Sequence, residues 1–157
     1  MRRPVYCVVV VFLALVQPAT KAAQEADAWA GTWKLNVAQS FYELSAAPKS
    51  EVVRFERSGE GWKISEDVNY VDGSWMHRHG VFKFDGIACP VAPVLFTTWA
   101  FTRIDEHAYD LVEKRGGSLI SITRTAISTD GTTRTSTTVG TNEQGRTVQN
   151  IAIYERQ

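Results

Sequence analysis

The sequence predicts an all-β protein whose strands close into an antiparallel up-and-down barrel of eight to ten strands. Turn signals that contain glycine recur along the chain, among them Asp72-Gly73, Gly116-Gly117 and Asp130-Gly131. The segments between them are mostly about ten residues long and rich in β-branched and aromatic residues, which favour strands. No segment shows a strong helical period. Sequential hairpins of this kind close their own edges in a barrel, and a β-sandwich is the alternative fold.

The expected elements follow from the spacing of these turns. A short helix or turn is expected over 37–44, directly after the first strand. The expected strands, in chain order, are residues 30–36, 50–58, 62–71, 74–84, 87–91, 95–104, 108–115, 118–128, 132–141 and 146–155.

The first 22 residues have the order of a secretory signal peptide. Two arginines precede an unbroken apolar run over 5–16, and Thr20-Lys21-Ala22 places small side chains at the two positions that a signal peptidase reads. The run is about a dozen residues long, whereas a membrane-spanning helix needs roughly 20. We therefore expect residues 1–22 to be removed, residues 23–157 to form one barrel domain, and the mature chain to be secreted or periplasmic.

Charge and cysteine content narrow the function classes further. Removing residues 1–22 takes away three of the 17 basic residues and none of the 17 acidic ones, so the mature chain is mildly negative. This balance argues against a nucleic-acid partner, which requires a basic patch. Cys7 leaves with the signal, so Cys89 has no intramolecular partner. We expect Cys89 to be a small buried side chain beside Pro90, with a reactive thiol or an intermolecular bridge as the alternatives.

Alternation along the strands predicts which side chains face inward. If Gly59-Glu60 is a two-residue turn, Val53 lies opposite Glu66 and Phe55 opposite Ile64. The shared apolar face is the inner one, and Glu66 sits in the middle of it. The inward set on these two strands is Val53, Phe55, Trp62, Ile64, Glu66, Val68 and Tyr70.

The next hairpin has two alternative registers. A two-residue Asp72-Gly73 turn places His77 and His79 inside, together with Trp75 and Val81. A three-residue loop that ends with Gly73 in the left-handed region places Arg78 inside, opposite Glu66, together with Met76, Phe82 and Phe84. We favour the second register, because it gives the inward carboxylate a partner and an unpaired buried charge costs several kcal/mol.

Two later hairpins predict a common inner face for the following strands. A loop over 105–107 sets Arg103 opposite Tyr109, and a turn at Gly116-Gly117 sets Tyr109 opposite Arg124. The predicted inward side chains are Trp99, Phe101, Arg103, Tyr109, Leu111, Ile120, Ile122 and Arg124.

Two constellations point to chemistry other than binding. His77 and His79 are two residues apart on one strand and could share a metal ion, but the favoured register turns them to solvent and His107 is distant, so no metal site is predicted. Glu66, Tyr109 and an arginine could form an acid–base site inside the barrel. No nucleophile–base pair and no phosphate loop is visible, so the sequence favours a protein that is not an enzyme and predicts no cofactor.

The stretch Gly31-Thr32-Trp33-Lys34-Leu35-Asn36 resembles the opening signature of the calycin superfamily, which includes lipocalins and fatty-acid-binding proteins. The resemblance implies that Trp33 plugs the closed end of the barrel and that Gly31 lets the chain bend there. Together with further motifs, it extends over nearly the whole mature chain and is similar to a family of small exported bacterial lipocalin-like proteins without established activity. Gln39 and Cys89 depart from the lysine and tyrosine expected there, and the Thr-Asp-Tyr signature and long C-terminal helix of true lipocalins are absent. The further motifs are Ser40-Phe41, Pro48-Lys49-Ser50, Asp85-Gly86, Pro90-Val91, Asp130-Gly131, Gly140-Thr141 and Tyr154-Glu155-Arg156-Gln157.

These observations lead to three functional hypotheses of different classes. The first is a binding protein for a small, partly apolar ligand inside the barrel. The second is a filled barrel without a ligand that acts through its outer surface, and the third is a cofactor-free isomerase. A small hydrophobic or amphipathic ligand is the expected partner, without nucleic acid and without a membrane span, and the oligomeric state stays open. The expected ligand-binding residues are Glu66, Arg78, Trp99, Arg103, Tyr109 and Arg124.

Overall fold

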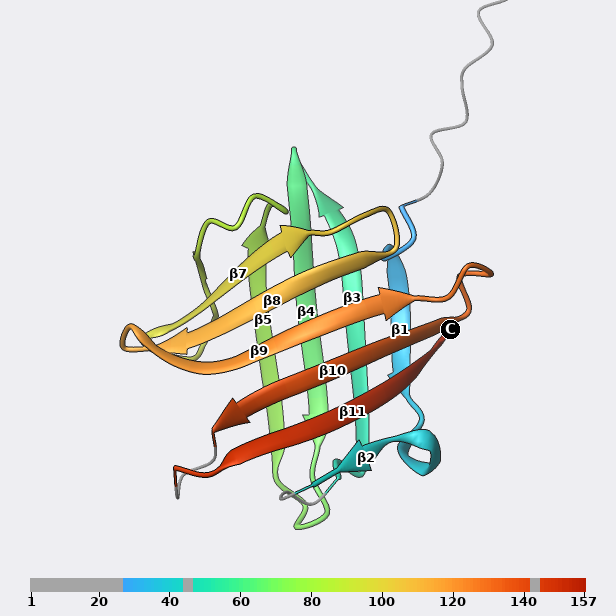
Figure 1. Ribbon diagram of the computed structural model, residues 1–157, viewed down its shortest axis with the longest axis vertical. Coiled ribbons are helices and arrows are strands. Elements are labelled where there is room, and N and C mark those ends of the chain that lie inside the picture. The colour runs from blue at the N-terminus through green and yellow to red at the C-terminus, as the bar shows by residue number, and fades with distance from the viewer. Residues whose placement is uncertain (1–26, 44–46, 142–144) are drawn as a thin grey trace, which may run out of the picture.

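The computed structural model describes residues 27–43, 47–141 and 145–157, which form one antiparallel sheet curled into a nearly closed barrel (Figure 1). Within these residues the sheet has eleven strands, in the order β5-β4-β3-β1-β11-β10-β9-β8-β7-β6, with β2 paired to β11. The predicted fold class is confirmed. The predicted signal peptide, residues 1–22, lies outside the described residues.

The observed elements match the expected strands closely. The expected helix over 37–44 is replaced by a single 3-10 turn and a two-residue strand, and the strand expected over 87–91 shrinks to two residues. In the described ranges, no helix is long and apolar enough to cross a membrane. The elements are β1 (Gly31–Leu35), η1 (Val37–Gln39), β2 (Phe41–Tyr42), β3 (Ser50–Ser58), β4 (Gly61–Asn69), β5 (Trp75–Phe82), β6 (Cys89–Pro90), β7 (Thr97–Arg103), β8 (Ala108–Arg115), β9 (Ser118–Ile127), β10 (Thr133–Thr141) and β11 (Thr147–Arg156).

The barrel closes at two seams of different strength. At the first, β1 pairs with the last strand, β11, and with β3 on its other side. At the second, β5 meets the segment after β6 through one bridge, in which His79 and Ala92 exchange two backbone hydrogen bonds of 2.8 Å. In Figure 1 the strands β3, β4 and β5 run steeply, and β7 to β11 cross them obliquely, so the interior is enclosed between two crossed walls.

The closed end of the barrel is built around Trp33, which is fully buried as the resemblance implied. Its indole Nε1 donates a hydrogen bond of 2.9 Å to the carbonyl oxygen of Trp29. The guanidinium carbon of Arg156 lies 4.3 Å from the centre of the Trp33 ring. Gly31 has a φ of +114°, and a Cβ there would come within 3.1 Å of the Arg156 side chain, so this position requires glycine.

Aromatic side chains fill the half of the barrel next to this end. Phe82 and Phe101 stack across the interior with their ring centres 3.7 Å apart. Trp62 and Trp99 face inward and are buried, as predicted. This half therefore forms a tightly packed core of aromatic side chains. The aromatic members of the core are Trp29, Trp33, Phe55, Trp62, Phe82, Trp99, Phe101, Tyr109 and Tyr154.

Candidate ligand-binding cavity

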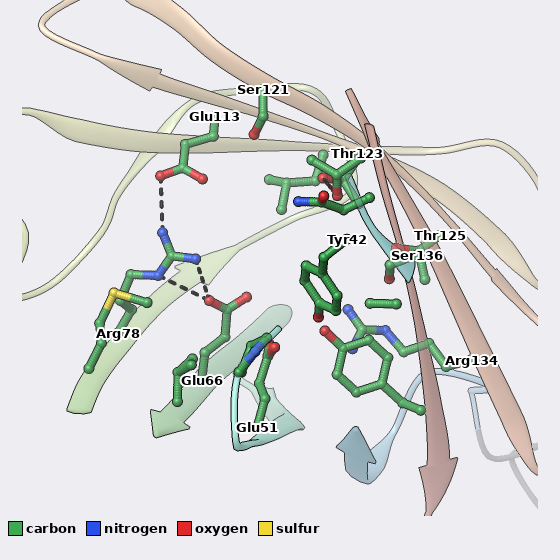
Figure 2. A pocket seen from close by; sticks show the side chains of 18 of the residues that line it. Tyr42, Glu51, Glu66, Arg78, Glu113, Ser121, Thr123, Thr125, Arg134 and Ser136 are labelled. Atoms are coloured by element: carbon green, nitrogen blue, oxygen red, sulfur yellow. Dashed lines mark hydrogen bonds and ion pairs between the residues drawn. The ribbon is translucent and has the colours of Figure 1, made fainter. Parts of the chain in front are cut away.

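A cavity of about 360 Å³ occupies the half of the barrel that the aromatic core leaves open. It lies between inward-facing side chains of β3, β4 and β5 on one wall and of β8 to β11 on the other, and Tyr42 of β2 also lines it (Figure 2). Most of the side chains that line it end in a carboxylate, a guanidinium, an amide or a hydroxyl. The interior therefore combines a half packed with aromatic side chains and a half with a polar cavity.

A partly buried network of three charged side chains joins β4 and β5 on one wall to β8 on the other. The guanidinium of Arg78 donates to Oε2 of Glu66 from Nε (3.0 Å) and Nη2 (2.7 Å), and to Oε1 of Glu113 from Nη1 (3.0 Å). Arg78 also lies over the ring of Trp99, 5.0 Å from its centre. Burial lowers the pKa of Arg78, but Glu66 and Glu113 outweigh this effect and the pKa is raised. Arg78 is thus held by two carboxylates and is not free to anchor a ligand.

The turn before β5 explains why Glu66 and Arg78 meet. The backbone N–H of Tyr70 donates to the carbonyl of Ser74 at 2.9 Å, which encloses a three-residue loop over 71–73. Gly73 closes the loop with a φ of +85°. Glu66 pairs with Arg78 across the two strands. The favoured register, including the inward position of Arg78, is confirmed.

The opposite wall carries a second buried arginine, Arg134 of β10, which is 5% exposed. Its Nη2 donates to the hydroxyl oxygen of Tyr109 at 3.3 Å, whereas its Nε and Nη1 have no hydrogen-bond partner among the described residues. The guanidinium carbon lies 4.4 Å from the ring centre of Tyr154 and 5.6 Å from that of Phe55. Burial opposes the charge, but Tyr109, Tyr154 and Glu51 raise the pKa, so Arg134 is a cation with unmet donors at the cavity wall.

Glu51, at the start of β3, is the third carboxyl group of the cavity. Burial, and then the charge of Glu66, raise its pKa from the ordinary 4.5 to about 7, against the opposing effects of Arg134, a hydrogen bond from Tyr154, and Arg78. Near neutral pH this group therefore exchanges its proton readily.

The two strands β9 and β10 add a wall of hydroxyl groups. The hydroxyls of Thr123 and Thr138 lie 2.8 Å apart, and those of Thr125 and Ser136 lie 2.9 Å apart. All four side chains line the cavity (Figure 2 labels three of them). Both strands are rich in threonine and serine, and alternate residues of each strand face inward, so their hydroxyl groups line the cavity.

The prediction that Arg124 faces inward is wrong. A β-bulge between β8 and β9 pairs Leu119 with Lys114 and Ser121 with Glu113, which leaves Ile120 as an extra residue. The register is shifted by one from there on, so Thr125, and not Arg124, lies opposite Tyr109. Arg124 projects outward, with its side chain 66% exposed and its Nε bound to Asp110 at 2.9 Å.

The same bulge turns Ile122, which was also predicted to face inward, to the outer surface, where it is 45% exposed. A bulge places two residues opposite one and reverses the faces beyond it. The inner wall consequently carries hydroxyl groups where the unbroken alternation predicted isoleucines.

Arg103 pairs with Tyr109 as predicted but does not reach the cavity. It lies at the closed end, where its guanidinium stands 5.2 Å from the centre of the Trp29 ring and 3.6 Å from Asp27. Trp99 and Tyr109 point inward as predicted, yet both belong to the aromatic core beneath Arg78 and Arg134. Among the six expected ligand-binding residues, Glu66 and Arg78 line the cavity.

Most of the groups expected for the two alternative chemistries are engaged in other contacts. His77 lies on the outer face, with its Nδ1 2.6 Å from Asp67, and His79 lies beside it. Within the described ranges, no three histidine, cysteine or acidic side chains stand close enough together to hold a metal ion. For the acid–base alternative, Glu66 is held by Arg78 and the Tyr109 hydroxyl accepts from Arg134.

Cys89 is partly buried against the core, and its burial raises the pKa of the thiol. This position agrees with the expected small buried side chain beside Pro90. It does not favour a reactive thiolate, which requires a lowered pKa.

The sequence reasoning missed Glu51, Glu113, Arg134 and Tyr154. The inward position of Arg134 could have been predicted, because Arg134 follows the Asp130-Gly131 turn and pairs with Ile127, a residue of the core. Tyr154 was obscured by the pattern of its strand, in which Ile151 and Ile153 suggest the opposite inward face.

Comparisons with known proteins bear on the fold. No protein-family model and no curated protein sequence matches the chain. Among solved structures, a single-substitution mutant of the fluorescent protein UnaG is similar with a TM-score of 0.58 and 14% identity over 83% of this chain and 96% of that one. A zebrafish ileal bile acid-binding protein complexed with cholic acid has a TM-score of 0.49 and 12% identity, over 83% of this chain and 99% of that one. The siderocalin Ex-FABP has a TM-score of 0.36 and 14% identity, over 83% of this chain and 71% of that one.

At such low sequence identities the similarity concerns the fold alone. The UnaG structure, with its TM-score of 0.58, is the one on which the fold comparison rests. The chain therefore shares the antiparallel barrel fold of that structure.

Proposed function

We propose that the mature chain is an exported binding protein for a small, partly apolar acid, whose anionic group is held by Arg134 in the barrel cavity. The observation that carries the proposal is the state of Arg134: a buried, charged guanidinium at the cavity wall, for whose Nε and Nη1 the part of the chain that the structure describes offers no partner. A buried donor without a partner costs about 1–3 kcal/mol, and more when it is charged. A carboxylate or a similar anion relieves this cost and forms charge-assisted hydrogen bonds.

The cavity distinguishes this function from that of a ligand-free, filled barrel. Its volume, about 360 Å³, lies within the usual range for ligand pockets, roughly 300–1,000 Å³. The rings of Tyr42 and Tyr154 and the side chains of Met76 and Leu111 offer apolar contacts to the rest of the ligand. The filled-barrel hypothesis describes only the aromatic half of the interior.

A titration with benzoate and its neutral isostere benzamide, followed by NMR, tests the anchoring role. We expect benzoate to bind at least about tenfold more tightly than benzamide, because only the anion pairs with the guanidinium. Arg134→Gln should remove this difference. Arg124→Gln is the matched control, since Arg124 lies on the neighbouring strand but points outward to Asp110, and it should leave benzoate binding unchanged. Equal benzoate affinity in wild type and Arg134→Gln contradicts the proposal.

Export is proposed on the sequence alone, from the basic start, the apolar run and the small residues at Thr20-Lys21-Ala22. N-terminal sequencing of protein from the culture fluid or the periplasm should give a start near Ala23. An intact Met1 on protein from the cytoplasm contradicts this part of the proposal.

A further inference from the structure

We infer that the ligand is a compact acid with hydroxyl or similar hydrogen-bonding groups on its body, and not an acid with an alkyl chain. The inference rests on the proposed function, since it concerns the part of the ligand that lies beyond the anionic group at Arg134. It is carried by what faces the cavity: a row of hydroxyl groups on β9 and β10, and carboxylate oxygens on β3, β4 and β8.

The hydroxyl wall has hydrogen-bonding capacity that the protein does not use itself. In the pairs Thr123–Thr138 and Thr125–Ser136, one hydroxyl donates to the other. A hydroxyl has one donor and two acceptor sites, so each pair keeps an O–H and several lone pairs for another partner. Ser121 adds a further hydroxyl to the same wall. These groups form a ladder two residues apart along each strand, facing the cavity.

The carboxylates of the cavity have unused acceptors. Arg78 binds Oε2 of Glu66 on β4 and Oε1 of Glu113 on β8, and within the described residues the second oxygen of each carboxylate has no arginine donor. Glu51 of β3 adds a third carboxyl group. Donors on a ligand, such as hydroxyl groups, match these oxygens, whereas methylene groups do not.

An alkyl chain is a poor occupant of such a space for two reasons. First, it would displace water from the hydroxyl and carboxylate groups without replacing the hydrogen bonds, which costs affinity. Second, the aromatic half of the barrel, where a chain would find apolar surroundings, is already filled by side chains such as Phe82 and Phe101. Sites built to hydrogen-bond a substrate hydroxyl reject analogues that lack it far more strongly than apolar pockets reject extra groups.

Two pairs of acids with matched carbon skeletons test the inference by calorimetry on the mature chain. Gluconate is compared with hexanoate, and quinate with cyclohexanecarboxylate. In each pair both members carry the carboxylate, so any contribution of Arg134 cancels. We expect the hydroxylated member to bind at least about tenfold more tightly.

A single hydroxyl on the wall provides the second arm of the experiment. Thr123→Val keeps the shape of the side chain but removes the cavity-facing hydroxyl. It should weaken gluconate and quinate by about five- to tenfold and leave hexanoate unchanged, because one hydrogen bond is lost. Thr137→Val is the matched control: Thr137 pairs with the outward-facing Arg124 and should affect no acid.

The outcomes separate the inference from the proposed function. If hexanoate and cyclohexanecarboxylate bind as tightly as their hydroxylated partners, or more tightly, the inference is overturned while the anchoring role of Arg134 stands. The inference is also overturned if benzoate binds through Arg134 but neither hydroxylated acid binds. If benzoate does not bind either, the proposed function itself fails.

Discussion

The guanidinium of Arg134 lies against the ring of Tyr154, with 4.4 Å between the guanidinium carbon and the ring centre, yet two of its donor nitrogens have no partner. The stacking fixes the position of the guanidinium but provides no hydrogen-bond acceptor for Nε and Nη1. A buried charge with unpaired donors lowers the stability of the ligand-free protein and stabilises a bound anion. Stability and binding should therefore respond in opposite directions when Arg134 is replaced.

We predict that Arg134→Met raises the free energy of unfolding by about 1–3 kcal/mol while abolishing benzoate binding, since apolar replacement of a buried charge is often stabilising. Urea denaturation of the ligand-free mature chain measures the first effect and NMR titration the second. Arg124→Met, on the outer face, should change neither. A marked loss of stability in Arg134→Met would mean that the guanidinium holds the barrel together and is not a ligand anchor.

For the second arginine of the cavity, Arg78, we predict that removing one of its partners lowers the stability of the protein. Glu66→Leu should destabilise the protein by about 3–5 kcal/mol, because it leaves Arg78 buried with only one of its two carboxylates. Glu60→Gln is a suitable control, since Glu60 is exposed and pairs with Lys83 at the surface. The denaturation midpoint of the control should not move. A loss below about 1 kcal/mol for Glu66→Leu would show that cavity water already screens the pair.

The Glu66–Arg78 contact also shows how far the sequence allowed prediction. Two short loops set the register of β3, β4 and β5, and each ends or begins with a glycine in the left-handed region, which a sequence displays openly. The turn chemistry and the cost of an unpaired charge were therefore sufficient to place both side chains. Trp33 and Gly31 could also be predicted, because both belong to the Gly-x-Trp motif. The φ of +114° at Gly31 is a conformation that L side chains rarely adopt.

The β8–β9 hairpin marks the limit of that reasoning. Its Gly116-Gly117 turn was recognised, but the bulge at Ile120 depends on packing between strands and leaves no turn residue as a sign. One extra residue was enough to exchange Arg124 for Thr125 on the inner wall. The cavity could not be predicted for a related reason: its lining comes from strands that meet only after the barrel closes, as Glu51 of β3 meets Arg134 of β10.

We predict that Trp33→Ala lowers the free energy of unfolding by about 3–5 kcal/mol, the usual cost of deleting a large buried aromatic side chain. The variant also removes the surface on which Arg156 stacks. Trp75→Ala is the matched control, because Trp75 is 73% exposed and should change stability by less than about 0.5 kcal/mol. Equal effects of the two substitutions would contradict the structural role assigned to the closed end.

The last prediction concerns the pH dependence that Glu51 imposes. Its pKa is raised from 4.5 to about 7 in the folded protein, so between these values the folded state binds more protons than the unfolded chain. The stabilising contribution of Glu51 is fully present below about pH 4.5 and is lost as the pH rises through about 7. The charged and titratable groups that act on it are Glu66 of β4, Arg78 of β5, Arg134 of β10, Tyr154 of β11, and the tyrosines Tyr42 and Tyr70.

Glu51→Gln isolates this contribution, because all other groups titrate in both proteins. The stability of wild type relative to Glu51→Gln should fall by roughly 1–3 kcal/mol between about pH 5 and pH 8. Benzoate should follow the same trend: an anion at Arg134 repels an ionised Glu51, so wild-type affinity should be higher at about pH 6 than at about pH 8 and uptake of the anion should draw in a proton. In Glu51→Gln the affinity should be nearly independent of pH over this range. If the pH dependence of benzoate binding is unchanged in Glu51→Gln, a group other than Glu51 takes up the proton, and Glu51 does not interact with the anion at Arg134.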